Sequence, residues 1–284
     1  MVRFPKQMRR ACSLALFWVT IARAALAELP AEIRVVTYNI HHGEGTDRKF
    51  NLERIVKRMM AEKPDIIALQ EVDQKTRRAS GVDQPAEFER LTGMKAYFGR
   101  NIEFDGGGYG TAVLTSLPVI LAEQVKLKSY YVPTKDNPEQ RGVQVLTIGE
   151  HDKPELLFLC THLDYRPPDD ERMNSAITIN ELITKRGDTP ALIAGDFNAQ
   201  PESRAIKEFE KEWKIAGDDA PLLTFPAEKP DRSIDYVMYR PADEWKVEQV
   251  RVLDEPVASD HRPVLAVLRL KSGDSAKSQP PKQD

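Results

Sequence analysis

Residues 192–201 read LIAGDFNAQP, an apolar strand that ends in a carboxylate and an amide. Side chains alternate between the two faces of a strand, so Asp196 and Asn198 share one face and Phe197 lies on the other. Aspartate, asparagine and proline also start turns, so this stretch alone does not separate a turn from a functional site. Its meaning depends on whether other strands end in the same way.

Several other extended runs also end in polar side chains. The apolar segments 35–38, 66–69, 157–161, 233–234 and 257–259 are each followed by one or more of them. Taken singly, each has a structural explanation as a turn residue, a helix-start acid or a surface histidine. A fold that brings strand ends to one edge would gather them into a cluster, and four of the five histidines lie at such ends. The residues concerned are Asn39, His41, His42, Glu71, His162, Asp164, Asp235, Asp260 and His261.

Extended and helical segments alternate along residues 33–268, with neither a repeat nor a long linker. Helical spacing follows Asn51, a predicted N-cap, and again follows Asp169 or Asp170. Many strands with only three or four helices predict two packed β-sheets flanked by helices, in one domain that spans residues 30–270. Strands are predicted at 33–38, 65–69, 111–114, 119–122, 142–148, 156–160, 191–194, 233–239, 245–252 and 264–268.

The two ends of the chain are predicted to lie outside that domain. Residues 1–27 have the order of a secretory signal peptide: a basic start, an apolar run at 11–21 and small residues before Glu28. We expect cleavage after Ala27 and a secreted or periplasmic protein with no transmembrane segment. A membrane anchor is the alternative, but the run is too short to span a bilayer. Residues 271–284 lack aromatic and branched apolar side chains and are predicted to be a disordered tail.

Charge and cysteine content limit the function classes. The chain has 41 basic and 44 acidic residues, and residues 1–27 hold five basic and no acidic ones. Cleavage would leave 36 basic against 44 acidic residues, a net charge of -8. Such a chain does not favour long nucleic acid as its substrate, because that binding relies on basic surface. Cys160 would be the only cysteine, which excludes an internal disulfide and predicts a buried thiol.

The side chains at the strand ends suit the hydrolysis of a phosphoester. Glu71 and the amide oxygen of Asn39 are oxygen ligands, the kind that Mg²⁺ or Mn²⁺ prefers. Zinc is disfavoured, because the chain has no HExxH motif and no paired cysteines. Aspartate and histidine beside a cation can orient water, transfer protons and stabilise phosphoryl charge. These residues therefore predict a hydrolase with Mg²⁺ as its cofactor.

A series of short motifs occurs in order along residues 33–270, nearly the whole mature chain. One such motif is weak, but chance would have to place every member in sequence. The series resembles the endonuclease/exonuclease/phosphatase superfamily, which implies a four-layer αββα sandwich with two mixed sheets. The motifs are TYNIHHG (37–43), LQEVD (69–73), YGTAVLTSLPV (109–119), RG (141–142), THLD (161–164), GDFN (195–198), SIDYV (233–237) and SDHRPV (259–264).

The resemblance implies a role for each matching residue. Asn39 and Glu71 would hold Mg²⁺, and Asp260 would lie close to the metal. Asp196 would orient or deprotonate the attacking water, and Asn198 would stabilise the phosphoryl transition state.

Further roles come from the same resemblance. His261 would bind the phosphate, held in place by Asp235. His162 would be a second phosphate contact or the acid that protonates the leaving group. Arg141 and Asp164 would bind substrate, although a salt bridge accounts equally well for Arg141.

The roles of two more histidines and the identity of the substrate each have more than one interpretation. His41 and His42 either line the substrate pocket or form local hydrogen bonds in the turn at Gly43. GDFN continues as AQP, unlike in inositol phosphatases, and the QEVD and THLD forms are similar to those of sphingomyelinases and deadenylases. We expect a monomeric phosphodiesterase that acts on a small or lipid-linked substrate. An extracellular nuclease on DNA or RNA and a non-catalytic binding protein are the alternatives.

Overall fold

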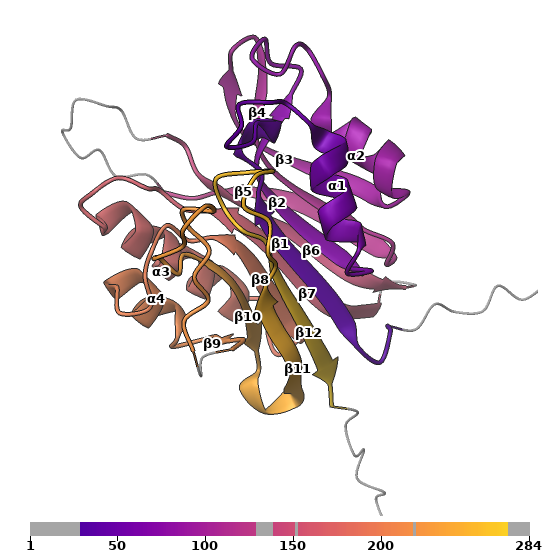
Figure 1. The fold of residues 1–284 in the computed structure, drawn as a ribbon. Helices are drawn as coiled ribbons and strands as arrows, with labels where there is room; N and C mark the ends of the chain where they lie inside the picture. Colours follow the sequence, from indigo (N-terminus) through magenta and orange to yellow (C-terminus); the bar gives the residue numbers. More distant parts are fainter. Residues whose placement is uncertain (1–28, 129–138, 151–152, 218–219, 272–284) are drawn as a thin grey trace, which may run out of the picture.

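The computed structural model describes residues 29–128, 139–150, 153–217 and 220–271. The predicted signal peptide and all but the first residue of the predicted tail lie outside these ranges. Within the described chain, twelve strands form two six-stranded sheets (Figure 1). Pairing is parallel between β1 and β2 and between β7 and β8, and antiparallel between the other neighbours.

The strand order of each sheet places the motif-bearing strands at its centre. The first sheet runs β11 (Trp245–Val252), β12 (Val264–Leu270), β1 (Ile33–Asn39), β2 (Ile66–Gln74), β4 (Gly107–Thr115) and β3 (Lys95–Phe104). The second runs β5 (Val119–Lys126), β6 (Gly142–Glu150), β7 (Lys153–His162), β8 (Ala191–Asp196), β10 (Asp235–Arg240) and β9 (Lys214–Ile215).

Helices cover the outer face of each sheet, one pair on either side (Figure 1). Ile55 and Phe88 of the first pair pack on the first sheet, and Ile179 and Phe209 of the second pair pack on the second. A third buried cluster fills the space between the sheets, so the predicted four-layer αββα fold is confirmed. Among the described residues, no helix combines the length and apolar character needed to cross a bilayer. The helices are α1 (Leu52–Met60), α2 (Gln84–Thr92), α3 (Asp170–Thr184) and α4 (Arg204–Phe209), with 3₁₀ turns η1 (His41–Gly43) and η2 (Ala242–Glu244).

The layers follow from the alternation of side chains along the central strands. In β1, Val35 faces the second sheet whereas Val36 faces the helices. In β8, Ala194 faces the first sheet whereas Ile193 faces α3 and α4. Cys160 of β7 is fully buried in the layer between the sheets, as predicted. When the side chain at the end of a strand lies on the face that points between the two sheets, it therefore lies at the edge of this middle layer.

Several local features depart from the sequence prediction. The elements α2, β3, α4 and β9 were not predicted, and β3 lacks clean alternation because it lies at a sheet edge. Asn51 caps α1 as predicted, with its side chain accepting the Arg54 N–H at 2.9 Å. Asp169 is the N-cap residue of α3, where the sequence placed the start of that helix, but its carboxylate makes no capping hydrogen bond and pairs with Arg204 at 3.1 Å instead.

Candidate active site

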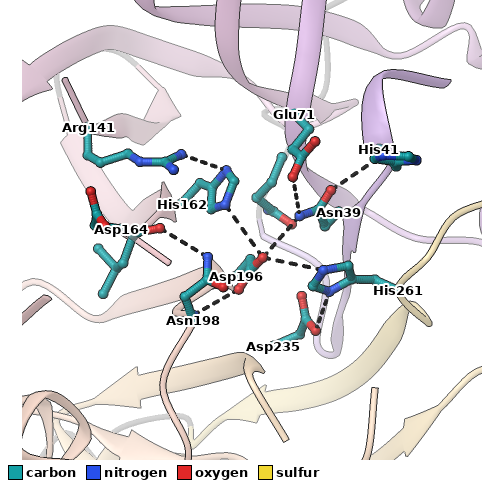
Figure 2. A network of polar contacts seen from close by, with 12 residues as sticks. Asn39, His41, Glu71, Arg141, His162, Asp164, Asp196, Asn198, Asp235 and His261 are labelled. Carbon is teal, nitrogen blue, oxygen red and sulfur yellow. Dashed lines mark hydrogen bonds and ion pairs between the residues drawn. The ribbon is translucent and has the colours of Figure 1, made fainter. Parts of the chain in front are cut away.

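Four of the predicted residues extend the row of side chains on the face of their strand that points between the two sheets. They are Asn39, His162, Asp196 and Asp235. Asn39 ends β1, His162 ends β7 and Asp196 ends β8, and all three are buried. Register sets their neighbours: His162 pairs with Asp196 across β7 and β8, and Asp235 pairs with Asp196 across β10 and β8. One imidazole and two carboxylates therefore form a row, and Asn39 meets it from the other sheet (Figure 2).

Glu71 reaches this point because β2 is irregular. Leu69 faces the helices, so regular alternation would direct Gln70 inward and Glu71 outward. The pairing of β2 with β4 shifts between Leu69 and Val72, a β-bulge in which Glu71 adopts a φ of 60°. A bulge re-aims the side chains around it. The Glu71 carboxylate consequently accepts a hydrogen bond from Asn39 Nδ2 at 3.1 Å.

The loop before β12 brings Asp260 and His261 to the same edge. Ser259 ties this loop to β1, because its hydroxyl lies 2.7 Å from the backbone oxygen of Asn39 and 3.3 Å from Asp260 Oδ1. His261 is buried, and Asp260 is partly exposed. Asp260 is thus linked through Ser259 to the backbone of Asn39, one of the two predicted metal ligands on the strands.

Asp196 is the centre of the cluster. Its Oδ2 accepts a hydrogen bond from Asn39 Nδ2 at 3.0 Å. His162 Nε2 lies 3.6 Å from that oxygen, and His261 Nε2 lies 3.7 Å from it. Its Oδ1 accepts the backbone N–H of Asn198 at 2.8 Å. Nitrogens from three separate segments therefore converge on one carboxylate oxygen (Figure 2).

The pKa of Asp196 is raised to about 7. Burial is the largest cause, since it removes water from the carboxylate, and the negative charge of Asp235 adds to it. His261 and the hydrogen bonds from Asn39 and Asn198 act in the opposite direction. A carboxylate whose pKa lies near neutrality is suited to accept a proton from water.

His261 is held as a cation. Its Nδ1 lies 2.9 Å from Asp235 Oδ2, an oxygen that also accepts the Thr224 hydroxyl at 2.5 Å. Burial alone would lower the pKa of His261, but the charges of Asp235 and Asp196, and the hydrogen bond to Asp235, raise it to about 10. The imidazolium therefore donates to Asp235 through Nδ1 and directs its second N–H toward Asp196.

His162 is held in the neutral state. Arg141 Nη1 lies 3.1 Å from His162 Nδ1, and Glu139 pairs with Arg141 at 3.0 Å. A guanidinium can only donate, so Nδ1 accepts and the imidazole proton resides on Nε2. Burial, followed by the charges of Arg141 and His261, lowers the pKa of His162 well below its usual value. Of its two proposed roles, this geometry favours a hydrogen-bond donor over an acid for the leaving group.

The acidic side of the cluster has the donors of a divalent-cation site. Glu71 and Asp196 each lie within 3.1 Å of the same amide nitrogen of Asn39. One neutral amide does not neutralise two carboxylates, and oxygen ligands suit Mg²⁺ and Mn²⁺. The Asn39 oxygen accepts the His41 N–H at 3.1 Å, so the amide would have to turn to present that oxygen to a cation.

A second group of potential ligands lies on the other side of Asp196. One donor atom from each of Asp196, Asp235 and His261 lies within 4.8 Å of the others. Asp235 Oδ1 is buried and has no hydrogen-bond partner among the described residues. Because His261 Nδ1 already bonds to Asp235 Oδ2, a cation here would have to use the unpartnered oxygen or displace the imidazole. The described donors therefore fit a divalent cation on either side of Asp196.

Asn198 and Asp164 lie beside the cluster with their polar groups partly engaged. Asn198 Nδ2 donates to the backbone oxygen of Leu163 at 3.1 Å. Asp164 is buried, and its carboxylate accepts the backbone N–H of Arg166 at 2.8 Å and pairs with the Arg166 guanidinium. Asp164 is therefore committed to shaping the loop after His162, and direct substrate contact by its carboxylate would require that pair to open.

His41 and His42 form η1, with φ values of 43° and 46°. His41 Nδ1 lies 3.1 Å from the backbone oxygen of Glu44, and its ring points away from Asp196 (Figure 2). The backbone oxygen of His42 accepts Gln84 Nε2 at 2.6 Å, and burial lowers the pKa of His42 to about 4. Of the two alternatives for these histidines, the structure shows local hydrogen bonding for His41.

Three polar partners in the cluster were missed by sequence reasoning. Thr224 donates to the carboxylate that holds His261, and Glu139 pairs with the arginine that holds His162. Neither lies in a recognised motif. Ser259 does lie in SDHRPV, but its bond to the backbone of β1 depends on a contact 220 residues apart in sequence.

A model of the Endonuclease/Exonuclease/phosphatase family matches residues 36–261, a range that includes all the predicted site residues. The chain belongs to this family. Its members hydrolyse phosphoester bonds and generally depend on a divalent metal, which agrees with the donors around Asp196. No curated protein matches the chain.

Solved structures share the fold over most of the chain. A family member from Beutenbergia cavernae has 21% identity and a TM-score of 0.69, with 86% of this chain and 72% of that chain covered. The mannosyl-6-phosphatase of Bacteroides thetaiotaomicron has 20% identity and a TM-score of 0.67, with 83% and 99% covered. The human Nocturnin catalytic domain with bound sulfate has 19% identity and a TM-score of 0.65, with 87% and 97% covered.

Proposed function

We propose that this protein is a divalent-cation-dependent phosphodiesterase that acts outside the cytoplasm on a small or lipid-linked substrate. The observation that carries the proposal is the convergence of Asn39, His162 and His261 on one oxygen of Asp196, with Glu71 beside them. A binding protein has no need of a buried carboxylate whose pKa is about 7, held between an imidazolium and a neutral imidazole. Hydrolysis of a phosphoester uses each of these groups.

In the proposed reaction, Asp196 takes a proton from a water molecule whose oxygen attacks phosphorus. The bond from phosphorus to the leaving oxygen breaks, and that oxygen keeps the electron pair and takes a proton from solvent. His261 offers positive charge and an N–H to the phosphoryl oxygens, and His162 offers a neutral N–H. Glu71 and Asn39 would hold the cation, which supplies positive charge at a non-bridging oxygen.

Surface composition supports a small or lipid-linked substrate. The acidic net charge disfavours long nucleic acid. Three exposed apolar side chains lie within two residues of site residues: Tyr165 is 64% exposed, Leu223 40% and Val257 37%. Tyr165 follows Asp164 and Leu223 precedes Thr224. Apolar groups at this edge could contact the apolar part of an ester.

The test is an assay of the purified protein with Mg²⁺ or EDTA on bis-4-nitrophenyl phosphate, 4-nitrophenyl phosphate, plasmid DNA and phospholipid vesicles. We expect hydrolysis of the diester in Mg²⁺, and loss of that activity in EDTA and in Asp196→Ala. Asp170→Ala removes an exposed carboxylate of α3 and serves as the control. Activity that survives EDTA or Asp196→Ala would contradict the mechanism, and preferred cleavage of plasmid DNA would favour the nuclease.

Export is a separate part of the proposal, supported by the signal-like order of residues 1–27. The full-length chain should be recovered from the periplasm or medium of a bacterial host with Glu28 as its first residue. N-terminal sequencing of the recovered protein measures this directly. Protein that keeps residues 1–27 and stays with the membrane would support the anchor instead.

A further inference from the structure

A cation stacked on an aromatic ring adjoins the catalytic cluster. The guanidinium carbon of Arg232 lies 4.4 Å from the ring centroid of Phe225. That ring in turn lies 4.7 Å, between centroids, from the imidazole of His261. The positive charge of Arg232 is thus one aromatic ring away from the imidazolium that faces Asp196.

The segment that carries this stack is anchored to the cluster. Phe225 and Arg232 form an isolated β-bridge, with N–H···O distances of 3.2 Å and 3.0 Å. Thr224, next to Phe225, bonds to Asp235, and the backbone N–H of Ala227 donates to the backbone oxygen of Asp260 at 2.6 Å. These contacts fix the position of the cation before a substrate arrives, so little ordering cost remains to be met on binding.

Arg232 differs from two other arginines near the cluster, Arg141 and Arg166. Arg141 is buried against Glu139 and His162, and Arg166 is paired with a buried carboxylate. The Arg232 side chain is 50% exposed, and its acidic contact is Asp231 at 3.4 Å, itself 75% exposed. A pair between exposed groups is weak, so Asp231 leaves most of the charge available.

We propose that Arg232, held on Phe225, binds a second phosphate group of the substrate, beyond the ester that is hydrolysed. This inference rests on the proposed function and narrows the substrate to a compound with two phosphates. A guanidinium presents a planar pair of donors that matches two phosphate oxygens, and its stacked face leaves the outer donors accessible. Because the predicted mature chain has a net charge of -8, a local cation at this position would attract an anionic group that the chain as a whole repels.

The first experiment measures binding without turnover. Isothermal titration in Mg²⁺ compares thymidine 3′,5′-bisphosphate with thymidine 5′-phosphate, two probes that differ by one phosphate. We expect the bisphosphate to bind the wild-type protein about tenfold more tightly, the size of one charge-assisted contact. Arg232→Gln should bring the two Kd values to within about twofold, and Arg232→Lys should keep part of the preference.

The control is Arg269→Gln, because Arg269 is also a half-exposed arginine, 47% exposed, but lies near the far end of β12. This variant loses the same charge and should keep the tenfold preference if position matters rather than net charge. A wild-type protein with equal Kd values, or an Arg232→Gln variant that keeps the preference, would overturn the inference.

A second measurement separates this inference from the proposed function. Hydrolysis of bis-4-nitrophenyl phosphate, which has no second phosphate, tests the phosphodiesterase alone. If that ester is hydrolysed and the binding preference does not depend on Arg232, the inference fails while the function stands. If the preference depends on Arg232 but no ester is hydrolysed, the second-phosphate site stands and the function fails.

Discussion

His162, at the end of β7, and His261, in the loop before β12, face the same oxygen of Asp196 at 3.6 Å and 3.7 Å, yet they carry different charges. Burial lowers the pKa of both imidazoles. Arg141 beside His162 lowers its pKa further, whereas the negative charges of Asp235 and Asp196 beside His261, with the hydrogen bond to Asp235, together reverse the effect of burial. Both imidazoles are buried beside the same carboxylate, so the charge of the second partner, Arg141 or Asp235, is the feature that differs between them.

This asymmetry gives Asp196 its proposed role. Two imidazoliums would stabilise the Asp196 carboxylate and lower its pKa, so it would be a weaker base. Two neutral imidazoles would leave the phosphoryl charge with less compensation. With one of each, the imidazolium provides a cation next to the reacting group, while burial and Asp235 still raise the pKa of Asp196 to about 7.

Removing the shared oxygen should have the largest effect. Asp196→Asn keeps the size of the side chain but removes the base and the charge that both imidazoles face. We expect kcat for bis-4-nitrophenyl phosphate to fall about a thousandfold, within the range for loss of a general base. Asp170→Asn is the control, since that carboxylate is exposed on α3 and should leave kcat unchanged. A fall of less than tenfold in Asp196→Asn would assign the base role elsewhere.

Removing the partner of His261 should have the next largest effect. Asp235→Asn leaves an amide where the imidazolium had a carboxylate, so we expect kcat to fall about a hundredfold. Thr224→Val is the matched variant, because Thr224 bonds to the same oxygen but carries no charge. It should lower kcat by about tenfold, since its hydroxyl donates a hydrogen bond to a charged carboxylate but removing it leaves that charge in place. Equal losses in the two variants would show that the geometry of Asp235, rather than its charge, matters.

Removing the partner of His162 should cost less, because a neutral donor contributes less than a cation. Arg141→Met deletes the group that fixes the proton on His162 Nε2, and we expect kcat to fall about tenfold. Arg141→Gln can still donate to Nδ1 and should recover part of that loss. Steady-state kinetics on the same diester measures both. A loss confined to KM would instead place Arg141 in substrate binding, the role first predicted for it.

The alternation of side chains between the two faces of a strand explains which parts of this site could be predicted from the sequence. Asn39, His162 and Asp196 each stand two residues beyond an inward-facing position of a regular strand, so their convergence follows from a period of two. Asp235 follows from register, because β10 pairs it with Asp196. The two-sheet fold was predictable for the same reason: its central strands are apolar and bounded by turns.

The other features of the site and fold depend on local conformations and contacts that the sequence pattern does not predict. Glu71 faces the cluster through a β-bulge, and Asn198 adopts a φ of 47° beside it. Such conformations are disfavoured for non-glycine residues and persist where the surroundings impose them. The partners Thr224 and Glu139 lie outside the motifs, so the charge states of the two histidines required three-dimensional contacts. Edge strand β3 has too mixed a burial pattern to be read as a strand.

The most direct test compares the charge states of His162 and His261 themselves. It is a pH titration of the two imidazoles in metal-free protein, where the expected effect is a change of spectrum and not of activity. With EDTA present, ¹⁵N spectra should show His162 neutral, with its proton on Nε2, at pH 5.5, where a free imidazole is mostly charged. His261 should stay doubly protonated through pH 8, since its pKa is raised to about 10. The wild-type resonances are assigned by comparison with His162→Gln and His261→Gln.

The same shifts predict opposite slopes of stability against pH. Below about pH 6.5 His162 binds a proton in the unfolded chain but stays neutral in the folded protein. Its contribution to the free energy of unfolding therefore falls by up to about 1.4 kcal/mol per pH unit of acidification. His261 retains its proton when folded, so its contribution is present below about pH 6.5 and is lost as pH rises toward about 10. Urea unfolding of wild type and each Gln variant, at pH 5.5, 7 and 8.5 in EDTA, isolates the two slopes. Slopes of the same sign would mean that Arg141 and Asp235 do not set the charges of these two histidines.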